Sequence, residues 1–274
     1  MERKYENLRK PATTEKEAVQ RLYDVVSILR KECPWDKAQT HESLIKGMIE
    51  EAYEAVEAIK NNDMENLNEE LGDVLLQVVL HSIIAEETDE FSFISVVNDE
   101  CEKMIRRHPH IFAEEDIKSV DKVLEKWENI KGAEQGDKTQ TLILESVPKA
   151  LPALIRSYKV QKKAADVGFD WDDVSGAFSK IKEETEELLE VSAGMQQERI
   201  AEEVGDLLFS VVNAARFLDV DPEQALTKTT DKFVRRFSHI EKRASELGRT
   251  LSDMSLEEMD RLWDEAKELE RKTK

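Results

Sequence analysis

The sequence has few of the residues that interrupt helices or link segments covalently. Its 274 residues include only 9 glycines, 6 prolines and 2 cysteines, and aromatic residues make up 6%. So little glycine and proline excludes a collagen-like chain and argues against a disordered one. Two cysteines exclude a disulfide framework and fit the reducing cytoplasm, where we expect this protein.

Long apolar runs are also missing. The two longest, residues 74–85 and 207–218, span about a dozen residues each and include polar side chains, whereas a membrane-spanning helix needs about 20 apolar residues. Residues 1–10 are charged, so we expect no secretory signal. Basic residues number 40 against 60 acidic ones, a net charge of −20. Because this charge repels nucleic acids and anionic membranes, we expect neither as a direct partner.

An acidic pattern occurs twice with the same internal spacing. In the first copy, Glu50-Glu51-x-x-Glu54 is followed sixteen positions later by Glu70 and then by Asp73. The second copy repeats each step, with Glu183, Glu184, Glu187, Glu203 and Asp206. A single Glu-x-x-Glu is usually only a solvated helix face, but a solvated face has no reason to keep this spacing twice. The repeat therefore predicts two related modules, each with its own carboxylate site.

The spacing of apolar residues predicts an all-α protein made of these two modules. We expect helices at about 41–58, 64–86, 93–107 and 120–130, and again at about 175–192, 197–218, 222–247 and 255–271. Residues 132–150, rich in helix breakers, separate an N-terminal domain at 1–131 from a C-terminal domain at 151–274. Gly72 and Gly205 lie inside expected helices, where glycine costs about 1 kcal/mol relative to alanine. We therefore expect close helix packing beside the carboxylates.

In each module the carboxylates are spaced to hold a divalent cation. Residues three or four apart share a helix face, so two antiparallel helices bring Glu51 and Glu54 near Glu70 and Asp73. Four clustered carboxylates repel one another unless a cation neutralises them. Ligation by oxygen alone favours Mg²⁺, with Mn²⁺ as a substitute. The absence of Glu-x-x-His from both copies disfavours a di-iron centre.

Cationic and aromatic residues repeat as well. Lys232 and Arg236 lie one helical turn apart, and Trp263 follows them, as Trp127 follows a matching basic segment at residues 103–107. The cations either clamp phosphate oxygens or form surface ion pairs, and Trp263 either stacks on a base or packs in the core. Together with a carboxylate-bound metal, they favour a nucleoside polyphosphate that is attacked by water at a phosphorus atom.

Other interpretations stay open at this point. A deoxyuridine or phosphoribosyl nucleotide suits the same carboxylate chemistry. Alternatively, the chain is a nucleotide-sensing or helical adaptor protein whose metal sites are structural. A metal-storage bundle would bind iron, which the lack of Glu-x-x-His disfavours.

Over nearly its whole length, the sequence resembles the MazG-type nucleoside triphosphate pyrophosphohydrolases. The motif CPWDKAQT at 33–40, followed by EEAYE at 50–54, is similar to the N-terminal signature of that family. SVPKALP at 146–152 and KVQKKAADVGFDW at 159–171 resemble the segment that joins its halves, and EEVGD at 202–206 and KFVRRF at 232–237 resemble its second domain. The resemblance implies two tandem helical domains of the four-helix-bundle type, completed in a homodimer. It also implies Mg²⁺-dependent cleavage between the α and β phosphates of a nucleoside triphosphate.

The same resemblance implies roles for individual residues. The catalytic Mg²⁺ ligands would be Glu184, Glu187, Glu203 and Asp206, with a second metal site at Glu51, Glu54, Glu70 and Asp73. The implied nucleotide contacts are Lys180, Ile181, Lys182, Glu183, Glu184, Arg199, Ile200, Ala201, Glu202, Lys232, Arg236 and Trp263.

The first module departs from this pattern around its carboxylates. At the corresponding positions, Gly47 replaces Lys180 and Asn66 replaces Arg199. We therefore expect the second module to be the main active site and the first to be a metal site with weaker or regulatory turnover.

Overall fold

The computed structural model describes residues 4–113, 119–134, 136, 138–194 and 196–272. These residues form helices joined by turns, with no strand among them, which confirms the all-α prediction. The chain divides into two compact units, Met1–Glu134 and Gln135–Lys274. In the described part of the chain, no helix has the length and apolar character needed to cross a membrane.

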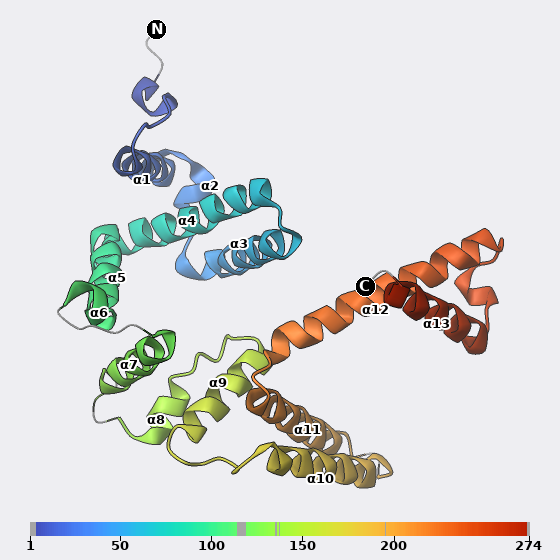
Figure 1. Ribbon diagram of the computed structural model, residues 1–274. Helices are drawn as coiled ribbons and strands as arrows, with labels where there is room; N and C mark the ends of the chain where they lie inside the picture. The colour runs from blue at the N-terminus through green and yellow to red at the C-terminus, as the bar shows by residue number, and fades with distance from the viewer. Residues whose placement is uncertain (1–3, 114–118, 135, 137, 195, 273–274) are drawn as a thin grey trace. The chain divides into compact units, whose positions relative to one another are not determined.

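The first unit is built around an antiparallel helix pair, α3 (His41–Asn61) and α4 (Met64–Glu86), seen side by side in Figure 1. The Thr40 hydroxyl accepts a backbone N–H at the start of α3, and the Asp63 carboxylate does the same for α4. Between the helices, Asn62 adopts a left-handed conformation with φ 54°. One such residue is enough to end a helix. Helix α3 therefore ends at Asn61, a little past the end predicted near residue 58.

The remaining helices of this unit support the pair. Helix α1 (Glu15–Glu32) packs on α4 and is followed by α2 (Pro34–Lys37). Helix α5 (Phe93–Arg107) contacts α4, α6 (Pro109–Phe112) and α7 (Val120–Ala133), and a short 3₁₀ helix, η1 (Glu6–Arg9), precedes α1. The core lies where α1, α3 and α4 meet, at Val26, Leu44, Val79, Leu80, Ile83 and Ile84.

The second unit repeats the helix pair with α10 (Val174–Ser192) and α11 (Gln197–Phe217). Helices α8 (Gln140–Glu145) and α9 (Ala153–Ala165) precede the pair, and α9 packs on α11. Helix α12 (Pro222–Glu246) then forms a second hairpin with α13 (Leu256–Lys272) through the 3₁₀ helix η2 (Leu251–Asp253) (Figure 1). That hairpin has its own small core of Ile240, Ala244, Met254 and Leu262.

Within each unit, the carboxylate hairpin has apolar side chains that no other helix covers. Ile45, Ile49 and Ile59 on α3 are exposed, as are Val204, Leu208 and Val211 on α11. A single exposed apolar residue is ordinary, but rows of them along one hairpin are typical of surfaces that another protein chain covers.

The glycines beside the carboxylates do not have the role that the sequence suggested. A Cβ built on Gly72 or Gly205 meets no atom within 4 Å. The predicted close helix packing at these two positions is therefore wrong within each unit.

Candidate functional site

The second unit gathers the predicted ligands at the α10–α11 hairpin. The carboxylates of Glu184, Glu203 and Asp206 offer oxygens that all lie within 4.8 Å of one another, and Glu183, Glu184 and Glu187 form an overlapping group. Glu184 belongs to both groups and is buried, whereas Glu187 and Asp206 are exposed. The four predicted ligands of the second module thus fall in two overlapping groups that share Glu184.

Lys180 pairs with two members of this cluster. Its ammonium nitrogen is 2.5 Å from Glu184 Oε1 and 2.8 Å from Glu183 Oε1. Hydrogen bonds to Glu183 and Glu184 raise the pKa of Lys180 above its ordinary value. Loss of solvent, with the charges of Glu184 and Glu203, raises the pKa of Glu187. The cluster therefore carries more negative charge than one lysine neutralises, and it favours a bound cation.

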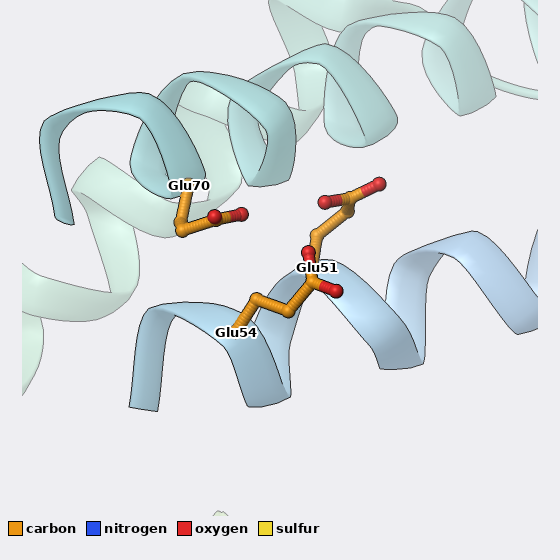
Figure 2. A group of neighbouring side chains, drawn as sticks. All are labelled: Glu51, Glu54 and Glu70. Atoms are coloured by element: carbon orange, nitrogen blue, oxygen red, sulfur yellow. The ribbon is translucent and has the colours of Figure 1, made fainter. Parts of the chain in front are cut away.

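The first unit brings Glu51 and Glu54 of α3 together with Glu70 of α4. Their oxygens lie within 4.8 Å of one another, and Figure 2 shows the three side chains meeting between the two helices. Loss of solvent raises the pKa of Glu51 and of Glu70, and the charge of Asp73 adds to both shifts. Asp73 therefore lies close enough to act on these carboxyls, although it is outside the group of three.

One difference in sequence distinguishes the carboxylate site of the first unit from that of the second. Gly47 stands where the second unit has Lys180, and a Cβ there would lie 2.9 Å from Nε2 of the buried Gln77. The residue that corresponds to Gln77 in the second unit is the smaller Ser210. Lys46, the nearest lysine on α3, instead pairs with the exposed Glu50 at 3.3 Å. The first cluster thus has no internal lysine among its described neighbours like the one beside Glu184.

Both carboxylate clusters fit a hard divalent cation. Carboxylate oxygens are the donors that Mg²⁺ and Mn²⁺ prefer, and the described members of each cluster are all carboxylates. The pKa values of Glu51, Glu70 and Glu187 are raised, as expected where clustered carboxylates lack a cation to neutralise them.

The predicted cationic and aromatic contacts gather on the other hairpin, α12–α13. The Arg236 guanidinium lies 5.4 Å from the centre of the Trp263 ring and pairs with Glu270 at 2.6 Å. Phe233 packs against Trp263, and the same ring touches the hairpin core. Trp263 thus packs in the core on one side and contacts Arg236 on the other, so the core interpretation holds in part, and stacking on a base stays a prediction.

Other predicted nucleotide contacts lie near the carboxylates. Ile181 and Lys182 are in the same stretch of α10 as Lys180, and Arg199 is exposed in the first turn of α11 with Ile200, Ala201 and Glu202 after it. Among the described residues, no hydrogen bond or ion pair joins Lys232, Arg236 or Trp263 to a carboxylate of α10 or α11. Within the part of the chain that the structure describes, no hydrogen bond or ion pair therefore joins the two halves of the predicted site.

Glu270 and Gln77 were not among the residues named from the sequence. Glu270 had a signal: it stands seven residues after Trp263, as Glu134 stands seven residues after Trp127. Gln77 had none, because its contact with Gly47 crosses the α3–α4 hairpin and depends on how the two helices pack.

Comparison with known proteins gives the same domain twice. The MazG nucleotide pyrophosphohydrolase domain matches residues 39–112 and 175–241, the two segments that contain the carboxylate hairpins. The Thermotoga maritima nucleoside triphosphate pyrophosphohydrolase/pyrophosphatase MazG is 46% identical over 92% of this chain and 98% of its own length.

Two further relatives differ in how much of them the chain covers. The Escherichia coli (strain K12) nucleoside triphosphate pyrophosphohydrolase is 38% identical over 92% of this chain and 98% of its own length. The uncharacterized protein YabN of Bacillus subtilis is 52% identical over 88% of this chain, which spans about half (49%) of that relative. With both carboxylate hairpins inside matched segments, the chain belongs to the MazG nucleotide pyrophosphohydrolase family.

Proposed function

We propose that this chain hydrolyses nucleoside triphosphates to a nucleoside monophosphate and pyrophosphate, with its main active site in the second unit. The observation that carries the proposal is the cluster of Glu184, Glu203 and Asp206 with Lys180 among its carboxylates. Membership of the family and the names of full-length relatives support the same reaction. One water molecule is consumed, and the bond between the α and β phosphates is broken.

In the second unit, some residues would bind the metal and others would bind the nucleotide. Glu184, Glu187, Glu203 and Asp206 would hold Mg²⁺, or Mn²⁺ in its place, through carboxylate oxygens. When bound, the ion supplies positive charge that activates water and neutralises phosphate oxygens. With the charge of Glu184 neutralised, Lys180 would donate hydrogen bonds to a phosphate oxygen, a role that Arg199, Lys232 and Arg236 would share.

The first unit would bind a metal at Glu51, Glu54, Glu70 and Asp73 with weaker or regulatory turnover. Gly47 supports this proposal. At this position the first unit lacks the ammonium group of Lys180, which would pair with a carboxylate or with a phosphate. We place the N-terminal domain at residues 1–131, a linker at 132–150 and the catalytic domain at 151–274.

We also propose that two copies of the chain form the working assembly. The exposed apolar rows on α3 and α11 need a partner surface. A homodimer would complete each helix pair as a four-helix bundle and would bring α12–α13 cations near a carboxylate hairpin. Sedimentation equilibrium tests this directly, since a monomer at micromolar concentration contradicts it.

Release of pyrophosphate tests the reaction. A panel of canonical and altered nucleoside triphosphates is incubated with Mg²⁺ and wild type, Glu203→Gln or Glu70→Gln. Glu186→Gln serves as a matched control, since this exposed glutamate of α10 lies outside the carboxylate groups. We expect monophosphate and pyrophosphate from wild type and Glu186→Gln, with activity lost in Glu203→Gln and retained in Glu70→Gln.

Each other outcome has a defined meaning. Loss of activity in both Glu203→Gln and Glu70→Gln would make the two units jointly catalytic. Nucleotide binding without turnover in wild type would contradict the enzyme and favour a nucleotide-sensing protein.

A further inference from the structure

Arg236, one of the proposed phosphate contacts, is held by a carboxylate from the neighbouring helix. Its Nε and Nη2 both donate to Glu270 Oε2, at 3.0 Å and 2.6 Å. The two side chains are only 17% and 33% exposed, so this pair is less solvated than an ordinary surface ion pair. The Trp263 ring lies against the same guanidinium. Arg236 is therefore restrained by a charge on one edge and an aromatic ring on its face.

The first unit contains the same arginine–glutamate pair in residues of its own. Glu134, directly after α7, accepts from Arg107 Nη2 at 2.5 Å and from Arg106 Nε at 2.8 Å. It stands seven residues after Trp127, just as Glu270 stands seven residues after Trp263. Seven residues are two helical turns, so Trp263 and Glu270 lie on one face of α13, and Glu134, whose backbone angles are still helical (φ −63°, ψ −21°), follows α7 at the same spacing. An arginine–glutamate pair kept in both units has a role that an incidental surface contact lacks.

The position of Glu270 determines which end of the Arg236 guanidinium another acceptor can reach. Because Glu270 occupies the edge formed by Nε and Nη2, the Nη1 end of Arg236 is the part that another acceptor can reach. Arg236 also lines a small open pocket of about 130 Å³ with Lys267, Glu270 and Arg271. Three cations and one carboxylate line it, and Lys267 and Arg271 pair with the exposed Asp264 and Glu268. This lining suits a phosphate oxygen better than a second carboxylate.

We propose that Glu270 is a positioning residue: it fixes the Arg236 guanidinium on Trp263 so that the Nη1 end donates to a phosphate of the nucleoside triphosphate. Glu270 does not contact the nucleotide, whose charge it would repel. The proposal rests on the proposed function and deepens it, since it names the group that orients one phosphate contact. Without Glu270 the long arginine side chain must be ordered each time a nucleotide binds.

Glu270→Gln tests this role because it keeps the size of the side chain and removes its charge. Ordering a freed side chain costs binding affinity, so we expect about a 3- to 10-fold rise in KM for the triphosphate. We expect kcat to stay within about twofold, because the carboxylate cluster on α10 and α11 is unchanged. Glu241→Gln is the matched control, since Glu241 is an exposed glutamate of α12 outside this pocket, and we expect both kinetic constants to stay at their wild-type values.

A double-mutant cycle separates positioning from general stability. If Glu270 acts only through Arg236, Glu270→Gln has no further effect on KM in an Arg236→Gln background. An additive effect, an unchanged or lowered KM, or an equal effect of Glu241→Gln would overturn the proposal. Should Glu270→Gln fail to fold, Glu270→Asp, which keeps the charge on a shorter arm, is expected to raise KM by a smaller factor, and an unchanged KM overturns the proposal.

The proposal and the proposed function fail in different ways. If wild type does not release pyrophosphate, the proposed function fails. Calorimetric titration with a triphosphate analogue that cannot be cleaved between its α and β phosphates then still measures whether Glu270→Gln weakens binding through Arg236.

Discussion

Replacing Lys180 with methionine tests its ion pair with the buried Glu184 of the second carboxylate cluster. The Glu184 side chain is only 5% exposed and lies 2.5 Å from the ammonium group, so little water can take the place of that group. Removing one partner of a fully buried pair costs about 3–5 kcal/mol, whereas an exposed pair contributes about 0–1 kcal/mol. Lys180 is 39% exposed, which puts the expected loss between these limits, at about 1–2 kcal/mol.

The assay is thermal unfolding with and without Mg²⁺. In chelator, Lys180→Met should lower Tm by about 2–8 °C for a chain of this size. Saturating Mg²⁺ should shrink the difference, because a cation then neutralises Glu184 in both proteins. Linkage requires the variant to bind Mg²⁺ more tightly, by about 5- to 30-fold if the whole difference disappears. Calorimetric titration with Mg²⁺ measures this second quantity independently.

Lys46→Met is the matched control in the first unit. Its pair with Glu50 spans 3.3 Å, and the side chains are 84% and 53% exposed, so the change in stability should stay within about 0.5 kcal/mol. Equal losses in the two variants would refute the reasoning. A loss in Lys180→Met that Mg²⁺ leaves unchanged would refute it too, because Glu184 would then not be the group that the lysine stabilises.

Two further predictions concern stability. Gly72→Ala and Gly205→Ala should each stabilise the protein by about 0.5–1 kcal/mol, because alanine favours a helix and its Cβ meets open space; a lowered Tm would show that a second copy covers these positions. Hydrogen bonds from Arg107 and from Arg249 lower the pKa of Glu134 and of Glu258 to about 2, from an ordinary value near 4.5. Lowered carboxyl pKa values mean that these ion pairs stabilise the fold above about pH 4.5 and lose that contribution as pH falls towards 2. Thermal unfolding over this range should therefore show a smaller fall in Glu258→Gln than in wild type, and an equal fall would contradict the assignment.

The helices and the carboxylate ligands could be read from local pattern. Apolar spacing predicted α4 and α5 at their observed bounds, because a helix needs only its own backbone and one apolar face. The Glu-x-x-Glu spacing placed Glu51 beside Glu54, and the repeat placed both across from Glu70. These contacts lie within one helix or one short hairpin, so sequence distance is a good guide to them.

Contacts between distant segments were decided by the tertiary structure. The pairing of Arg236 with Glu270 spans two helices of a hairpin, and it depends on which faces of α12 and α13 meet. The amide of Gln77 fills the space beside Gly47 only because α3 and α4 approach closely there. The same packing left Gly72 and Gly205 open, against the sequence expectation.

The sequence by itself therefore determined the helical class, the duplicated module and the carboxylates that meet in each hairpin, because helical periodicity and short turns encode them locally. Only the tertiary structure decided that Glu184, one helical turn after Lys180, is buried, that Gly47 has Gln77 against it, and that Glu270 holds Arg236 on Trp263. The physical reason is that burial and side-chain partners across helices depend on how whole helices pack, which no local spacing specifies.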